Sequence, residues 1–332
     1  MRRRDLASLR VARAVHCGRR MLKPLLLACI VSACATADGH HPDASPPPLQ
    51  PAGTYAARSA LHLATPLAGP ASVLVDDFRV ADDPSRYLVD KLIAALPDGE
   101  TKTFAQGLAP FLAAYLDSRL DAIAPRYLPG MRAVSDQLGA LTEQLETIET
   151  LSITENYSAV RTVVGLQVGK TDVMLSLGGI AEPAVATKIA FNRGQLAFDE
   201  HRMSLPYGRM VRLALDRGII PSVDPGAYDL TTLMRDLVDC PHLGQAIADA
   251  LGIGPAELYS EACVVGMTAA ATEMYEHLGA LDGASIELVA KGSASAVDLD
   301  RDGHVDGITS GIWTGTLDNV ALAGSTFEGK RE

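Results

Sequence analysis

The stretch AVRTVVGLQV, residues 159–168, decides the class of fold, because it follows the point near Glu149 where the spacing of apolar residues changes. A period of two places successive side chains on opposite faces of a β-strand. The even-numbered positions, 160 to 168, are occupied by Val, Thr, Val, Leu and Val. We therefore predict a strand whose even-numbered residues form the buried face.

Before this point the apolar residues follow a helical period. Segments 86–96, 108–124 and 131–148 each carry an apolar stripe, and Pro125 and Pro129 separate the second from the third. The third stripe has spacings of three and four residues, which is typical of a helix face that packs on a core; a short coiled coil is the alternative. We expect helices over about 86–148.

The rest of the chain alternates between the two periods. Strands are expected at 54–65 and 71–78, and then over about 149–216, where short turns containing Gly and Pro indicate antiparallel hairpins. A helical block covers about 229–279, and further strands cover about 285–328. This order predicts a single α+β domain, residues 54–332, in which a curved antiparallel sheet packs on long amphipathic helices.

The charge of the chain is unevenly distributed. The whole sequence has a formal net charge of −11, but residues 1–33 contribute seven Arg, one Lys and one Asp, so residues 34–332 carry −18. Such an acidic body repels nucleic acid phosphates, and we exclude nucleic-acid binding. The apolar content of 48% is sufficient for a real core.

Residues 1–33 have the pattern of a signal peptide, with Met21 as a second candidate start. An apolar run, 24–33, is too short to span a bilayer as a helix, and Val-Ser-Ala stands directly before Cys34. This arrangement resembles the lipobox of bacterial lipoproteins. The resemblance implies that Cys34 is lipidated and holds the protein to a membrane. The alternative is an ordinary signal peptide that is cleaved nearby.

Residues 34–53 are rich in Pro and predict a disordered tether between the membrane and the body. Ala35, rather than Asp, follows the cysteine. By the same resemblance to lipoproteins, we expect sorting to the outer membrane rather than the inner one.

Two cysteines, Cys240 and Cys263, remain in the body of the protein. Disulfides persist in oxidising compartments, so export predicts that this even pair is joined. Pro241 and the Gly252–Pro255 turn break the surrounding helical block, and the bond is expected to link two helices. Two buried free thiols are the alternative.

The segment DLDRDGHVDGI, residues 298–308, places oxygen-bearing side chains at alternate positions: Asp298, Asp300, Asp302, His304 (through its backbone carbonyl) and Asp306. It resembles the DxDxDG loops of EF-hands, dockerins and FG-GAP repeats, which implies a Ca²⁺ site. Thr309 stands where an EF-hand has its bidentate Glu, so the affinity should be weak, with a Kd of roughly 10⁻⁴–10⁻³ M. The alternative is a β-hairpin with a tight turn at Asp302-Gly303.

No motif for nucleophilic or zinc-dependent catalysis is present in the sequence, and the histidines are scattered. We interpret the protein as an exported, lipid-anchored envelope protein with a structural or interaction role and a weak calcium site. A carrier of a lipid or other apolar ligand is the first alternative, and a hydrolase is the second. The expected partners are the membrane, through Cys34, and either an apolar ligand or another envelope protein.

Overall fold

Strand β1 (Gly53–His62) shows how the sheet is built, because its side chains alternate between two faces. Tyr55, Ala57, Ser59 and Leu61 are buried, whereas the residues between them are exposed or half-buried. The computed structural model describes residues 48–68, 83–168, 174–282 and 285–332. Residues 1–33, Cys34, residues 35–47 of the proposed tether and the strand expected at 71–78 lie outside these ranges. The end of the predicted disordered tether was wrong, because residues 50–53 are bonded into the fold and β1 begins at Gly53.

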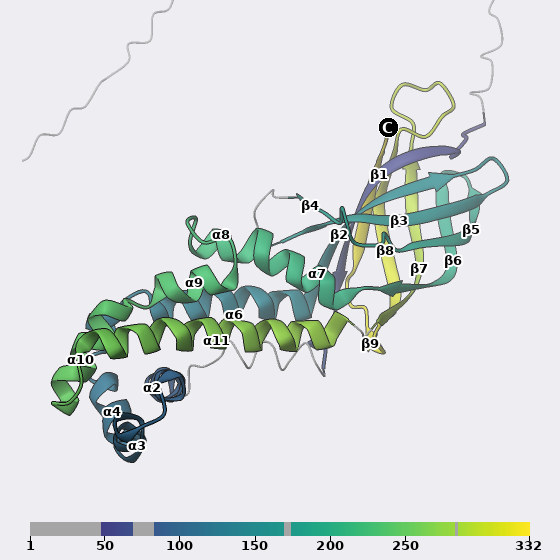
Figure 1. The fold of residues 1–332 in the computed structure, drawn as a ribbon. Helices are drawn as coiled ribbons and strands as arrows, with labels where there is room; N and C mark the ends of the chain where they lie inside the picture. Colours follow the sequence, from purple (N-terminus) through teal and green to yellow (C-terminus); the bar gives the residue numbers. More distant parts are fainter. Residues whose placement is uncertain (1–47, 69–82, 169–173, 283–284) are drawn as a thin grey trace, which may run out of the picture. The chain divides into compact units, whose positions relative to one another are not determined.

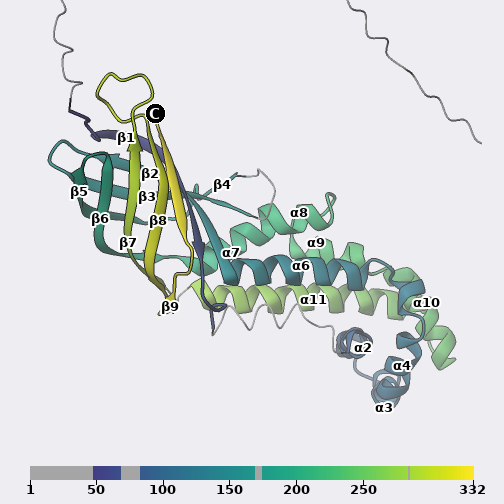
Figure 2. The same ribbon diagram turned by 180° about the vertical axis from the view of Figure 1, so that it is seen from behind.

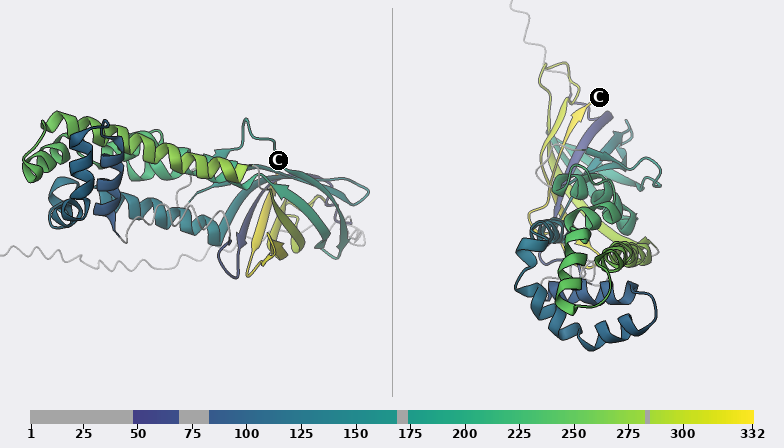
Figure 3. Two further views of the ribbon diagram at one scale, coloured as in Figure 1. Left: turned by 60° about the horizontal axis from the view of Figure 1, so that its bottom comes forward. Right: turned by 60° about the vertical axis from the view of Figure 1, so that its left-hand side comes forward.

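Eight antiparallel strands close into a barrel (Figures 1 and 2). Besides β1, the barrel consists of β2 (Gln144–Ile153), β3 (Ser158–Gln167), β5 (Ala184–Asn192), β6 (Gln195–Leu205), β7 (Ile286–Val297), β8 (Gly307–Leu317) and β10 (Thr326–Arg331). Two short strands, β4 (Met174–Ser176) and β9 (Val320–Ala321), pair with β3 and β8 outside the ring. The pairing order is β10–β1–β2–β3–β5–β6–β7–β8, and β10 also pairs with β8, which closes the ring. The α+β class and the antiparallel sheet are confirmed, and the curvature of the sheet continues to full closure (Figure 3).

The helices pack mainly on one another and are called the helical layer below. They are α2 (Pro84–Ala95), α3 (Glu100–Gly107), α4 (Ala109–Asp117), α5 (Leu120–Ile123), α6 (Tyr127–Glu143), α7 (Tyr207–Ala214), the π-helix η2 (Leu215–Ile219), α8 (Ile220–Val223), α9 (Leu230–Leu237), α10 (Cys240–Leu251) and α11 (Ala256–Asp282). Asp229 caps α9 by accepting a hydrogen bond from the Thr232 amide at 2.7 Å. Helix α10 ends at Gly252, whose positive φ of 66° suits a glycine.

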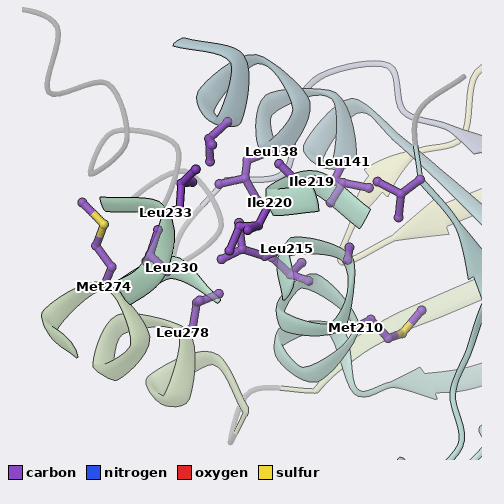
Figure 4. Close-up of a cluster of buried hydrophobic side chains, with 14 of the residues drawn as sticks. Leu138, Leu141, Met210, Leu215, Ile219, Ile220, Leu230, Leu233, Met274 and Leu278 are labelled. Atoms are coloured by element: carbon purple, nitrogen blue, oxygen red, sulfur yellow. The ribbon is translucent and has the colours of Figure 1, made fainter. Parts of the chain in front are cut away.

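The centre of the helical layer is apolar (Figure 4). Side chains from α6, α7, η2, α8, α9 and α11 meet there, including Leu138, Leu141, Met210, Leu215, Ile219, Ile220, Leu230, Leu233, Met274 and Leu278. The layer joins the barrel through continuous chain, because β2 begins directly after α6 and β6 leads into α7. At this junction the Tyr207 hydroxyl donates a hydrogen bond to the Leu141 carbonyl at 3.3 Å.

Two predicted boundaries were wrong. The helix expected to reach residue 148 ends at Glu143, and Leu145 and Ile148 lie in strand β2. Ten consecutive register pairs with β1 bring this segment into the barrel, so tertiary pairing overrides the local helical spacing. Conversely, the last part of the region expected to form strands, 149–216, contains helix α7, which buries Met210, Val211 and Ala214.

The predicted inner face of β3 holds only at its C-terminal end, where Leu166 and the following Val168 are buried, and it was wrong for the first part of the strand. Ala159, Arg161 and Val163 are buried, whereas Val160 is 41% exposed. A count of apolar residues favoured the even-numbered face because it assumed that an arginine belongs outside. Arg161 is inside because it has partners there.

Candidate functional site

The loop between β7 and β8 brings together three of the five residues predicted to bind calcium. One carboxylate oxygen from each of Asp298, Asp300 and Asp306 lies within 4.8 Å of the others. Asp298 and Asp306 are half-buried, and Asp300 is exposed. Three carboxylates so close together repel one another unless a cation or solvent screens them, and oxygen ligands of this kind suit Ca²⁺.

Backbone amides hold these carboxylates in position. Asp298 accepts hydrogen bonds from the amides of Arg301 at 2.6 Å and Gly303 at 3.0 Å, and Asp306 accepts one from Leu299 at 2.7 Å. Desolvation would raise the pKa of Asp298, but the amide hydrogen bonds outweigh it and leave the pKa below its ordinary value. This carboxylate is therefore ionised at neutral pH.

Asp302 lies outside this group, and His304, which was predicted to bind through its backbone carbonyl, contributes no side-chain ligand to it. Asp302 and His304 are exposed, and the Asp302 carboxylate accepts a hydrogen bond from the His304 amide at 2.7 Å. The loop spans nine positions between the strand ends at Val297 and Gly307, so the alternative of a tight two-residue hairpin does not describe it. The alternation of aspartates in the sequence could not reveal which of them face inward, because that depends on the path of the loop.

The loop is also attached to the segment that precedes β1. The Gln50 amide donates a hydrogen bond to the Gly303 carbonyl at 2.7 Å, and the Val305 amide donates one to the Gln50 carbonyl at 3.0 Å. The Tyr55 hydroxyl reaches the carbonyls of Pro51, at 2.7 Å, and Val305, at 3.3 Å. The acidic loop and the chain that enters β1 are therefore held together at one end of the barrel.

The structure joins Cys240 and Cys263 in a disulfide, the pairing that the sequence predicts. Their Cα atoms are 5.5 Å apart, and the bond links α10 to α11. The two helices also approach closely at Gly244, where an added Cβ would lie 2.6 Å from the Ser260 amide nitrogen. The predicted lipidation site, Cys34, lies outside the described residues.

The centre of the barrel holds an ion pair that was not predicted from the sequence. The Arg161 Nε and Nη2 atoms donate hydrogen bonds to Glu149 at 2.5 and 2.7 Å, and both side chains are 2% exposed. Desolvation would raise the pKa of Glu149, but the attraction and hydrogen bonding of Arg161 hold it below the usual value. The sequence carried no local signal for this pair, because the apolar residues of β3 favoured its even-numbered face and so placed Arg161 outside.

His201 and Trp313 complete this central cluster. The Nδ1–H of His201 donates to the Asp199 carbonyl at 3.0 Å, so its Nε2 accepts from Arg161 Nη1 at 3.3 Å, and the imidazole is neutral. Desolvation lowers the pKa of His201, and the charge of Arg161 lowers it further. The Arg161 guanidinium lies over the Trp313 ring at 4.5 Å. His201 itself is 5% exposed.

The cluster contains the types of side chain found in catalytic sites, but its histidine is not hydrogen-bonded to a hydroxyl nucleophile. Ser59 accepts a hydrogen bond from Trp313 Nε1 at 3.0 Å, while the Nε2 atom of His201 faces a guanidinium rather than a hydroxyl. A hydroxyl nucleophile needs a base that can accept its proton. The geometry of this cluster therefore favours a structural role.

Comparisons with known proteins give no relative: no family model, no curated protein and no solved structure matches this chain. Within the described ranges, none of the helices combines the length and the apolar character needed to cross a membrane. The role of the protein has to be inferred from the chemistry of its own side chains.

Proposed function

We propose that this protein is a lipid-anchored component of a bacterial cell envelope, with a structural or interaction role, whose barrel is stabilised by weakly bound Ca²⁺. The anchor is the lipid expected on Cys34, with the outer membrane as its location. The observation that supports the proposal is the position of the acidic loop. Its carboxylates converge in the loop whose backbone is hydrogen-bonded to Gln50, near the end of the proposed tether and just before β1.

A cation at this loop would strengthen the connection between the barrel and its tether. The loop connects β7 to β8, and its Gly303 and Val305 form the backbone bonds to Gln50. Cancelling the repulsion among the three carboxylates favours the loop conformation that makes these bonds. Calcium would therefore stabilise the end of the barrel that is joined to the proposed tether.

The filled centre of the barrel makes the carrier alternative weaker. A carrier of apolar ligands needs a mostly apolar cavity of several hundred Å³. Here the middle of the barrel holds the Glu149–Arg161 pair, and Phe198, Trp313 and Phe327 pack around it with ring centroids 4.1–5.6 Å apart. An apolar ligand at this position would have to displace a paired charge.

A calcium titration tests the proposed metal site. With a Kd of roughly 10⁻⁴–10⁻³ M, 10 mM Ca²⁺ should stabilise the fold by about 1–3 kcal/mol and raise the Tm by a few degrees. Asp300→Asn should abolish this shift, because it removes one converging charge. Asp302→Asn is the matched control and should keep most of the shift, since Asp302 lies outside the converging group. An unchanged Tm in the unmodified protein would remove calcium from the proposal.

The anchor is tested separately. In a bacterium that processes lipoproteins, the protein should be found in the membrane fraction, and its intact mass should include acyl chains. Cys34→Ser should release it from that fraction. Unmodified protein recovered without lipid would contradict the anchored role and leave the calcium result standing.

A further inference from the structure

The outer wall of the barrel contains a hollow of about 350 Å³ that the proposed function does not use. It extends across β8, β10, β1, β2 and β3, which are neighbours in the ring. The register aligns Thr326, Ala60, Glu146 and Gln167 in one row across four of these strands. Ala60 is the smallest residue of the row and stands between longer polar side chains, which makes the surface concave there.

Two opposite charges beside this row face each other without forming an ion pair. Arg58 on β1 is the cross-strand partner of Glu328 on β10, and both side chains are exposed. Such pairs normally attract. Among the described residues, however, neither forms a salt bridge, and the guanidinium instead lies 3.6 Å from the sulfur of Met174. Both charges line the hollow, and within the described ranges neither has an ion-pair partner.

A β-bulge builds the third side of the hollow. Ile308 pairs with Gly329 and Gly311 pairs with Phe327, so two residues of β8, Thr309 and Ser310, oppose the single residue Glu328. Ser310 has a φ of 52°, which is unfavourable for a residue other than glycine. Bulges and backbone strain of this kind are frequent at binding sites, where they redirect a side chain. Here the bulge places Ser310 in the wall of the hollow, opposite Glu328 on the neighbouring strand β10.

The approach of β8 and β10 depends on a glycine. An added Cβ at Gly311 would lie 2.3 Å from the Phe327 carbonyl oxygen and 2.6 Å from its ring. No side chain larger than hydrogen fits without moving the backbone of the neighbouring strand. The pocket wall is therefore fixed by the barrel itself rather than by a loop.

We propose that this outer-wall pocket binds a small zwitterionic ligand, an amino acid or a short peptide. The ligand carboxylate pairs with Arg58, and its ammonium group pairs with Glu328 and Glu146. The pocket has one cationic and two anionic side chains, so it favours a ligand with more amines than carboxylates, such as a basic amino acid. Ser310 and Gln167 supply neutral hydrogen-bonding groups. None of the residues of the acidic 298–306 loop lines this pocket, so the proposal is independent of calcium.

Isothermal titration with L-lysine tests the site, with cadaverine as the analogue that lacks the carboxylate and norleucine as the one that lacks the second amine. Lysine should bind more tightly than either. Arg58→Gln should weaken lysine binding about tenfold, in keeping with the loss of a charged hydrogen bond, and should change cadaverine binding less than about twofold. Glu328→Gln should weaken the binding of both lysine and cadaverine.

Arg202→Gln is the matched control, because Arg202 is an exposed barrel arginine that pairs with Glu287 at 3.5 Å and does not line the pocket. It should leave all three affinities unchanged. Thermal melting of each variant verifies the fold. The proposal is overturned if lysine shows no saturable binding at 20 mM, if cadaverine binds as tightly as lysine, or if Arg58→Gln has no more effect than Arg202→Gln.

Discussion

The barrel and the helical layer bury different kinds of side chain in their cores. Around Leu215, Leu230 and Leu233 the helices bury hydrocarbon against hydrocarbon. The centre of the barrel instead buries Arg161 and Glu149. Apolar packing tolerates changes that keep the volume constant, whereas a buried charge is stable only while its partner is present. The helical layer therefore depends on total volume, and the barrel depends on one specific pair.

The largest expected effect comes from breaking that pair. Glu149→Ala should lower the free energy of unfolding by about 3–5 kcal/mol, because Arg161 remains buried without a counter-charge. Urea unfolding at neutral pH measures the change. The double variant Glu149→Leu/Arg161→Met replaces both charges by hydrocarbon and should recover most of the loss. A double variant as unstable as the single one would show that the barrel needs the charges themselves.

The helical layer has its own specific link, the disulfide between α10 and α11. Replacing Cys240 and Cys263 by Ala should lower the free energy of unfolding by about 3 kcal/mol, because the unfolded chain regains the freedom of the loop between them. Urea unfolding of the variant gives the value, and the unmodified protein in reducing agent should show a similar loss. Equal stability with and without reductant would mean that the helices need no covalent link.

A pair of substitutions in β3 distinguishes the inner face of the barrel wall from the outer face. Val163 is fully buried and Val160 is 41% exposed. Val163→Ala should therefore lower the free energy of unfolding by about 2 kcal/mol through lost burial and a cavity, and Val160→Ala by less than about 0.5 kcal/mol. Chemical denaturation of both variants measures the difference. The reverse order would restore the even-numbered face that the sequence favours.

The smallest expected effect is a dependence on pH that belongs to the barrel. The pKa of His201 is below its ordinary value of 6.5 in the folded protein, so its contribution to stability is complete above that value. As the pH falls below about 6.5, the unfolded chain binds a proton that the folded barrel does not, and stability declines by up to about 0.7 kcal/mol between pH 7 and pH 6. Urea unfolding at these two values measures it. His201→Gln should remove this part of the slope, and an unchanged slope would mean that another group is responsible.

Local pattern was sufficient to predict the α+β class, the hairpins and the pairing of Cys240 with Cys263. It failed where pairing with residues far away in the sequence determines the local structure. The spacing that ends at Ile148 fits a helix, yet β1 pairs with that residue in the barrel. Closure could not be predicted, because it depends on β10 meeting both β1 and β8.

The acidic loop was predicted in part for the same reason. Alternating aspartates indicated a cation site, and Asp298, Asp300 and Asp306 do converge. Asp302 does not, because the flanking segments are strands whose ends set a different loop path from that between two helices. The buried Arg161 was missed because its partner Glu149 lies on a different strand, and neither residue has a local reason to be inside.

The double pairing of β10 also sets the order in which the protein is assembled. Until residues 326–331 are in place, β1 and β8 each have one unpaired edge. Contacts so distant along the chain slow folding, and open strand edges invite association with other chains. These two edges therefore stay open until the C-terminal strand has paired with both of them.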